Sequence, residues 1–136
     1  MSPDMRIDSL RTDAPAPENP PVSALAFLGD GVYGLMVREY LTQLSGGKAD
    51  KLHESNIRMV NASYQAAASK VLLPYLTPEE SGIFTRGRNT HTAHTPRNQS
   101  KSDYHAATGL ETLFGWLYIN GKTDRLKELF ARIVSL

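Results

Sequence analysis

The spacing of apolar residues along the chain predicts helices. The longest mostly apolar stretch, SALAFLGDGVYGLMVREYL, predicts a first helix over about residues 23–44, which the glycine-rich sequence SGGKAD ends. Apolar positions three and four apart predict a second helix over about residues 51–73, which ends before Pro74. No alternating stretch is long enough to predict a strand, so the predicted fold class is all-α.

Three more helices are predicted further along the chain. Thr77, Pro78 and Glu80 have the spacing of a capping box and predict the start of a short third helix. A polar segment over residues 86–103 separates it from a fourth, apolar helix over about residues 104–120. Thr123 is predicted to cap the last helix. Residues 1–22 contain five prolines and no apolar period, which predicts a flexible N-terminal arm before one domain over residues 23–136.

Composition narrows the class of protein. The chain has 136 residues, 40% of them apolar, which is enough for one buried core. It contains no cysteine, so disulfides, thiolate nucleophiles and thiolate metal sites are excluded. No apolar run is long enough to cross a membrane, and no signal segment is recognisable. We therefore expect a cytoplasmic protein without a membrane partner.

Two acidic residues interrupt the two most apolar predicted helices. Asp30 falls on the stripe that the first helix is expected to bury, which comprises Ser23, Phe27, Asp30, Gly34, Val37 and Leu41. Glu111 lies among apolar residues of the fourth helix. Each acid has a glycine four residues later, Gly34 or Gly115, and glycine lets another backbone or a ligand approach closely.

Two such helices could pack with both carboxylates at one point. Like charges in a core repel, so the pair would need a bridging cation, and Mg²⁺ prefers oxygen ligands of this kind. The alternative from the pattern alone is that each acid is solvated or is paired with a basic residue such as Arg38 or Arg58.

The polar segment is locally basic although the net charge of the chain is only +1. Between Glu80 and Asp103 there is no acidic residue, and small polar residues fill the gaps between the basic ones. Such a segment without aromatic residues suits the phosphates and 2′-hydroxyls of duplex RNA, and the alternative is a solvated loop. The residues predicted to bind RNA are Arg86, Arg88, Asn89, Arg97 and Lys101.

The histidines are weaker candidates for chemistry. His91 and His94 have the spacing of a zinc pair, but cysteine is absent and a third ligand would have to come from elsewhere. His53 and His105 are candidates for a general acid or base. The chain has no Ser-His-Asp or P-loop pattern.

These motifs resemble those of a known family. ALAFLGDGVYGLMVREYL resembles the signature of the ribonuclease III catalytic domain, and TGLETLFGWLY resembles the helix that carries its glutamate. LHESNIRMVNASYQA and the RGRN element resemble the segments between them, in the same order. More closely, the chain resembles the bacterial Mini-III branch, which lacks a double-stranded RNA-binding domain. The resemblance covers about residues 22–134.

The resemblance implies a function and a site. It implies that Asp30 and Glu111 are Mg²⁺ ligands and catalytic residues, and that Arg86, Arg88 and the segment to Lys101 grip duplex RNA. Ala26 and Thr108 stand where the full-length enzymes have two further acids, as in the Mini-III branch.

The resemblance also implies a substrate and partners. It implies a homodimeric, Mg²⁺-dependent endoribonuclease that trims the large-subunit (23S) ribosomal RNA precursor and leaves 5′-phosphate and 3′-hydroxyl ends. A large-subunit ribosomal protein is a further partner that the sequence leaves open. Two alternatives remain at this point: a non-catalytic RNA-binding module of the same fold that assists ribosome assembly, and a helical protein-interaction module.

Overall fold

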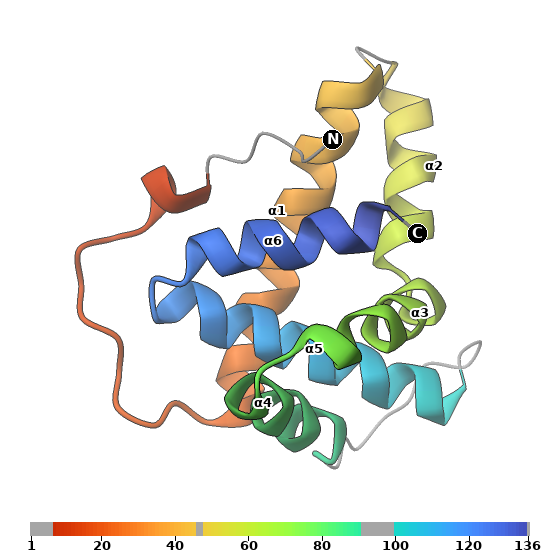
Figure 1. Ribbon diagram of the computed structural model, residues 1–136. Coiled ribbons are helices and arrows are strands. Elements are labelled where there is room, and N and C mark those ends of the chain that lie inside the picture. The colour runs from red at the N-terminus through yellow and green to blue at the C-terminus, as the bar shows by residue number, and fades with distance from the viewer. Residues whose placement is uncertain (1–6, 46–47, 91–99, 136) are drawn as a thin grey trace.

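The chain folds into helices packed around one central helix (Figure 1). The computed structural model describes residues 7–45, 48–90 and 100–135. Its α-helices are α1 (Val22–Ser45), α2 (Ala49–Val60), α3 (Ala62–Leu72), α4 (Pro78–Arg88), α5 (Lys101–Ile119) and α6 (Thr123–Val134). Two short 3₁₀ helices are η1 (Ile7–Leu10) and η2 (Leu73–Tyr75). None of these described residues forms a strand, which confirms the all-α class.

α5 is the central helix and packs against α1, α3, α4 and α6. Figure 1 shows α5 running through the middle of the molecule, with α6 turning back from the end of α5 and passing in front of α1. An aromatic cluster fills the core between these helices: the ring of Tyr33 meets those of Phe114 and Phe130 edge-on, with centroids 5.6 and 6.3 Å apart. No described helix is long and apolar enough to cross a membrane.

The predicted second helix over residues 51–73 is wrong, because two helices occupy that range and meet at Asn61. The backbone of Asn61 is extended, with φ −72° and ψ 159°, and its side chain accepts a hydrogen bond from the amide of Tyr64 at 2.8 Å. Asparagine is a strong N-cap, so it ends α2 and starts α3 although the apolar spacing continues through the break. The break frees α3 to pack on α5.

The predicted capping box at the start of α4 is confirmed. Thr77 Oγ1 accepts from the Glu80 amide at 3.1 Å, and the Glu80 carboxylate accepts from the Thr77 amide at 2.9 Å. Arg125 of α6 donates to both Glu80 oxygens, each at 2.9 Å. Burial alone would raise the pKa of Glu80, but the hydrogen bonds from Arg125 and Thr77 outweigh it and lower the pKa.

Two other predicted helix starts need correction. α5 begins at Lys101, three residues earlier than predicted, because Ser100 accepts a hydrogen bond from the amide of Asp103 at 3.0 Å and caps it. Thr123 is the first residue of α6 and not its cap; Lys122 holds that position and makes no side-chain cap bond.

Part of the N-terminal arm packs against the helices. Ile7 is 2% exposed and belongs to the core, and Asp8 pairs with Lys127 at 3.4 Å. Arg11 donates from Nε to the carbonyl of Tyr118 at 3.0 Å, at the end of α5. The sequence pattern predicted no element here. The division of the chain at residue 22 stays a prediction.

Candidate active site

The structure brings Asp30 of α1 and Glu111 of α5 together. The negative charge of Asp30 is close enough to raise the pKa of Glu111. Both side chains line a pocket of about 380 Å³ between the first halves of α1 and α5. Its other lining residues are Val22, Ser23, Ala26, Phe27, Thr90, Tyr104 and Thr108. The assignment of Asp30 and Glu111 as catalytic residues and metal ligands stays a prediction.

Two glycines set the distance between the helices that carry the acids. A Cβ atom at Gly29 would lie 1.6 Å from the carbonyl oxygen of Glu111, and one at Gly115 would lie 2.0 Å from that of Leu25. The backbones of α1 and α5 therefore touch directly beside the carboxylates. The prediction for Gly115 is confirmed, but its partner is Gly29 and not Gly34, where an added Cβ would meet only the end of the Arg38 side chain.

The predicted buried stripe of α1 is wrong in its first half. Asp30 is exposed and Phe27 is 84% exposed, whereas Val37 and Leu41 of the same stripe are buried. α1 is apolar on nearly all sides, so its period does not single out one face. The face that meets α5 at the site carries Leu25, Gly29 and Val32.

Electrostatics at the pair favour a proton or a cation. Burial raises the pKa of Glu111, and repulsion from Asp30 adds to the rise, so the pKa reaches about 8. Gln65 of α3 opposes this rise, because its Nε2 donates to Glu111 Oε2 at 3.4 Å. In the described part of the chain no lysine or arginine forms an ion pair with either acid, and Arg58 pairs with Glu54 at 3.9 Å.

The two carboxylates and the pocket suit a hard divalent cation. No group of three or more acidic, histidine or cysteine residues gathers anywhere in the described residues, so no third acid completes a cage. Ala26 and Thr108 line the pocket beside the pair. Mg²⁺ binds in proteins through one or two carboxylates, with waters and substrate phosphates as its other ligands, and this pair fits that pattern.

Four of the predicted RNA-binding residues lie in the described part of the chain, and their role in binding RNA stays a prediction. Arg86, Arg88 and Asn89 are exposed at the end of α4, and Lys101 is exposed at the start of α5. Arg88 donates to Asn89 Oδ1 at 3.5 Å, whereas Arg86 lines a different pocket beside Glu18 and Trp116. Arg97 lies outside the described residues. Thr90 joins this segment to the acids, because it lines their pocket.

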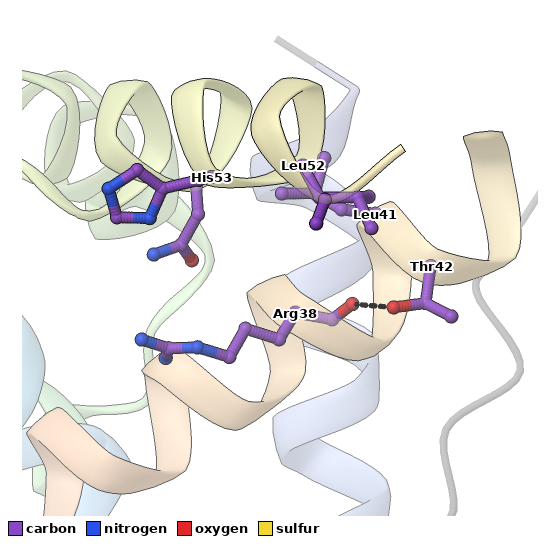
Figure 2. Close-up of a pocket in the computed structure, with 7 residues that line it drawn as sticks. Arg38, Leu41, Thr42, Leu52 and His53 are labelled. Carbon is purple, nitrogen blue, oxygen red and sulfur yellow. Dashed lines mark hydrogen bonds between the residues drawn. The ribbon is translucent and has the colours of Figure 1, made fainter. Parts of the chain in front are cut away.

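His53 and His105, the two candidate histidines that the structure describes, do not line the acidic pocket. His105 Nδ1 lies 2.9 Å from the carbonyl oxygen of Arg88, so it ties α5 to the end of α4. His53 lines a separate pocket of about 340 Å³ between α1 and α2 (Figure 2). Figure 2 shows Leu41 and Leu52 facing each other there, while Arg38 extends along the same pocket. His91 and His94 lie outside the described residues.

Sequence reasoning missed two residues that shape the site, Gly29 and Gln65. Gln65 is 2% exposed and is the longest polar side chain on the otherwise small, buried face of α3. An isolated amide on a buried face rich in alanine can indicate a functional side chain. Here that face is recognisable only when α3 is known to start after Asn61, because the start of the helix decides which residues share a face. Gly29 directly precedes Asp30, but the sequence pattern assigned the close backbone approach to Gly34 instead.

Comparisons with known proteins agree with this geometry. A model of the ribonuclease III domain matches residues 23–122. Mini-ribonuclease 3 of Clostridium tetani is 37% identical over 113 residues, which cover 82% of this chain and 75% of the relative. Mini-ribonuclease 3 of Symbiobacterium thermophilum is 39% identical over 110 residues, which cover 81% and 84%.

A solved structure has the same fold. A crystal structure of a protein from Fusobacterium nucleatum superposes with a TM-score of 0.78 at 30% identity, covering 87% of this chain and 94% of that one. The chain therefore belongs to the ribonuclease III family of endoribonucleases, in its Mini-ribonuclease 3 branch.

Proposed function

We propose that the chain is a Mg²⁺-dependent endoribonuclease that cuts double-stranded RNA. The observation that carries this proposal is that Asp30 and Glu111 line one pocket, where Gly29 and Gly115 bring α1 and α5 together. Thr90 connects this pocket to the basic end of α4. Each of these features serves a phosphodiester substrate: acids for a cation, a pocket for the scissile phosphate, and basic residues for the backbone.

Asp30 and Glu111 would hold the cation. When bound, Mg²⁺ acts as a Lewis acid that draws charge from the phosphate and makes a water more acidic. Glu111 must lose its proton before it can serve as a ligand, and Asp30 is exposed enough to meet substrate directly. Arg88 and Asn89 are exposed at the end of α4, just before Thr90 of the pocket, and Lys101 is exposed at the start of α5. These residues would bind backbone phosphates, together with Arg86 and Arg97.

The proposed substrate is the paired end of the large-subunit (23S) ribosomal RNA precursor, cut to leave 5′-phosphate and 3′-hydroxyl ends. The family resemblance supports this substrate, and so does a binding segment that suits a duplex and not single strands. A cytoplasmic location and a ribosomal-protein helper belong to the same proposal.

We further propose a homodimer, because two strands need two sites. Phe27 and Leu35 leave 84% and 41% of their surface exposed on the outer side of α1. Arg38, which lines the pocket between α1 and α2, lies roughly 16 Å further along the same helix. Two copies of α1 packed antiparallel about a twofold axis would place each Phe27 against the partner's pocket. There Leu41 and Leu52 offer an apolar wall and Arg38 offers a cation for the ring (Figure 2).

The direct test is cleavage of duplex RNA by purified protein with and without Mg²⁺. We expect metal-dependent cleavage that Asp30→Asn and Glu111→Gln abolish, while Asp124→Asn, an exposed acid at the start of α6, cleaves as wild type. Cleavage that survives either of the first two substitutions would show that the chemistry resides elsewhere.

The second candidate function is a non-catalytic RNA-binding module. The observation that favours it is that Ala26 and Thr108 line the pocket without a carboxylate. This candidate predicts that wild type binds duplex RNA, with an affinity that falls steeply with salt, and leaves it intact at every Mg²⁺ concentration.

A further inference from the structure

Gln65 is a polar side chain in a position suited to an apolar one. It is 2% exposed and lies on the face of α3 that packs against α5. The other buried members of that face are Ala62, Ala66, Ala68, Ser69 and Leu72. Ser69 satisfies its hydroxyl locally by donating to the carbonyl of Gln65 at 2.8 Å. Gln65 instead reaches outside its own helix.

The amide of Gln65 links two other helices. Its Nε2 donates to the carbonyl of Val60, the last residue of α2, at 2.9 Å. The same Nε2 donates to Glu111 Oε2 on α5 at 3.4 Å. The break at Asn61 makes this link possible, because it ends α2 at Val60 and starts the helix that carries Gln65.

The amide oxygen of Gln65 argues against a purely structural role. Gln65 Oε1 is buried and has no hydrogen-bond partner among the residues that the structure describes. A buried acceptor without a partner costs folding free energy, and a methionine would fill a similar volume without that cost. The benefit that offsets this cost has to come from what Nε2 holds, which is the Val60 carbonyl and Glu111. The bond to Val60 anchors the amide, and the bond to Glu111 is the one that reaches the candidate site.

We propose that Gln65 is a positioning residue for the cation site: anchored on the Val60 carbonyl, it fixes the orientation of the Glu111 carboxylate that binds the metal. The last torsion of a glutamate is broad, so a hydrogen bond to one oxygen is what sets the direction of the other. This inference rests on the proposed function. Hydrogen bonds to metal-ligating carboxylates commonly change metal affinity or activity by about 10- to 100-fold.

The test compares Gln65→Met with wild type in three measurements. The first is Mn²⁺ binding to RNA-free protein, followed by the electron paramagnetic resonance signal of free Mn²⁺. The second is the Mg²⁺ dependence of duplex cleavage, and the third is the Tm. We expect the Mn²⁺ Kd and the half-saturating Mg²⁺ concentration to rise by about 10-fold or more. The Tm should change little, because removing the unpaired Oε1 offsets the loss of the bond to Val60. The KM for RNA should stay unchanged because Gln65 is buried.

Ser69→Ala is the matched control. It removes a buried hydrogen bond one turn further along α3 and leaves the Gln65 amide in place. We expect a lower Tm with unchanged dependence on metal. If Gln65→Met keeps the metal dependence of wild type, or if both variants weaken metal binding equally, the positioning role is refuted. Gln65→Leu gives the same comparison should the methionine variant not fold.

Asp30→Asn separates this inference from the proposed function. Wild type should bind Mn²⁺ more tightly than Asp30→Asn and should cleave RNA. If it does neither, the proposed function fails and the role of Gln65 fails with it. If wild type does both and Gln65→Met behaves identically, only the inference about Gln65 is overturned.

Discussion

Gly29→Ala tests the claim that direct backbone contact sets the geometry of the acids. The new Cβ would lie 1.6 Å from the carbonyl oxygen of Glu111, 2.5 Å from its carbonyl carbon and 2.8 Å from the amide nitrogen of Gly115. Ordinary contact begins at 3.4 Å, so α1 and α5 must separate by about 1.8 Å at this point. All three atoms belong to backbone, so no side chain can move aside.

The separation has a cost in stability and a larger one in activity. Overpacking a core costs roughly 1–3 kcal/mol, and alanine regains at most about 1 kcal/mol over glycine in a helix. Because backbone is opposed to backbone, we expect a net loss of about 2 kcal/mol, or roughly 8 °C in Tm. The carboxylates move apart with their helices, and an error of about 1 Å in a catalytic geometry can reduce the rate about 100-fold.

The assay combines urea unfolding with cleavage of duplex RNA, at one protein concentration because a dimer would make stability depend on it. Gly82→Ala on α4 is the control, since a Cβ there meets nothing within 4 Å. That variant should be as stable as wild type or slightly more stable, with normal cleavage. A Gly29→Ala protein with wild-type stability and activity would refute the reasoning.

Three further predictions follow from the ionised and exposed groups. The pKa of Glu111 is raised to about 8, so its contribution to stability is fully present below its ordinary value of 4.5 and is lost as the pH rises through about 8. The Tm of Mg²⁺-free protein should therefore fall over that range and recover with Mg²⁺, and Mg²⁺ binding at pH 7 should release close to one proton, measured by calorimetry in buffers of different ionisation enthalpy. Phe27→Ser should convert the dimer to a monomer, measured by sedimentation velocity. Leu10 on η1 is also exposed, by 62%, and Leu10→Ser should leave the dimer intact. Equal sedimentation of the two variants would contradict the proposed interface. Arg125→Ala should destabilise the fold by roughly 3 kcal/mol at pH 7, because it leaves Glu80 buried without its partner. The loss should shrink as the pH falls through the lowered pKa of Glu80, which lies below 4.5, and urea unfolding from pH 7 down to pH 2 measures both.

The sequence predicted elements where the signal is local. The capping box of Thr77 and Glu80 needs only residues three apart, and the structure confirms it. The break at Asn61 was missed because apolar residues keep their helical spacing across it, and a single cap outweighs that spacing. Helix existence therefore followed from periodicity, but the division of residues 49–72 into two helices did not.

The sequence predicted which two acids form the site, but it did not predict their exposure or the residues that surround them. Two isolated acids in apolar helices pointed to Asp30 and Glu111, and the structure brings them together. The exposure of Asp30 could not be predicted, because α1 has apolar residues on several faces. The packing of α5 against α1 determines which of these faces is buried at the site. Gln65 could not be placed either, since its contact with Glu111 joins residues 46 apart in sequence.

The hydrogen bond from Arg11 to Tyr118 bears on how the chain matures during synthesis. It joins residues 107 apart, so its acceptor is made long after its donor. Arg11 leaves the ribosome early but has no Tyr118 carbonyl to bind until almost the whole domain has been synthesised. A nascent chain truncated before α5 therefore lacks this hydrogen bond. The N-terminal segment therefore reaches its final packing only after α5 has been synthesised.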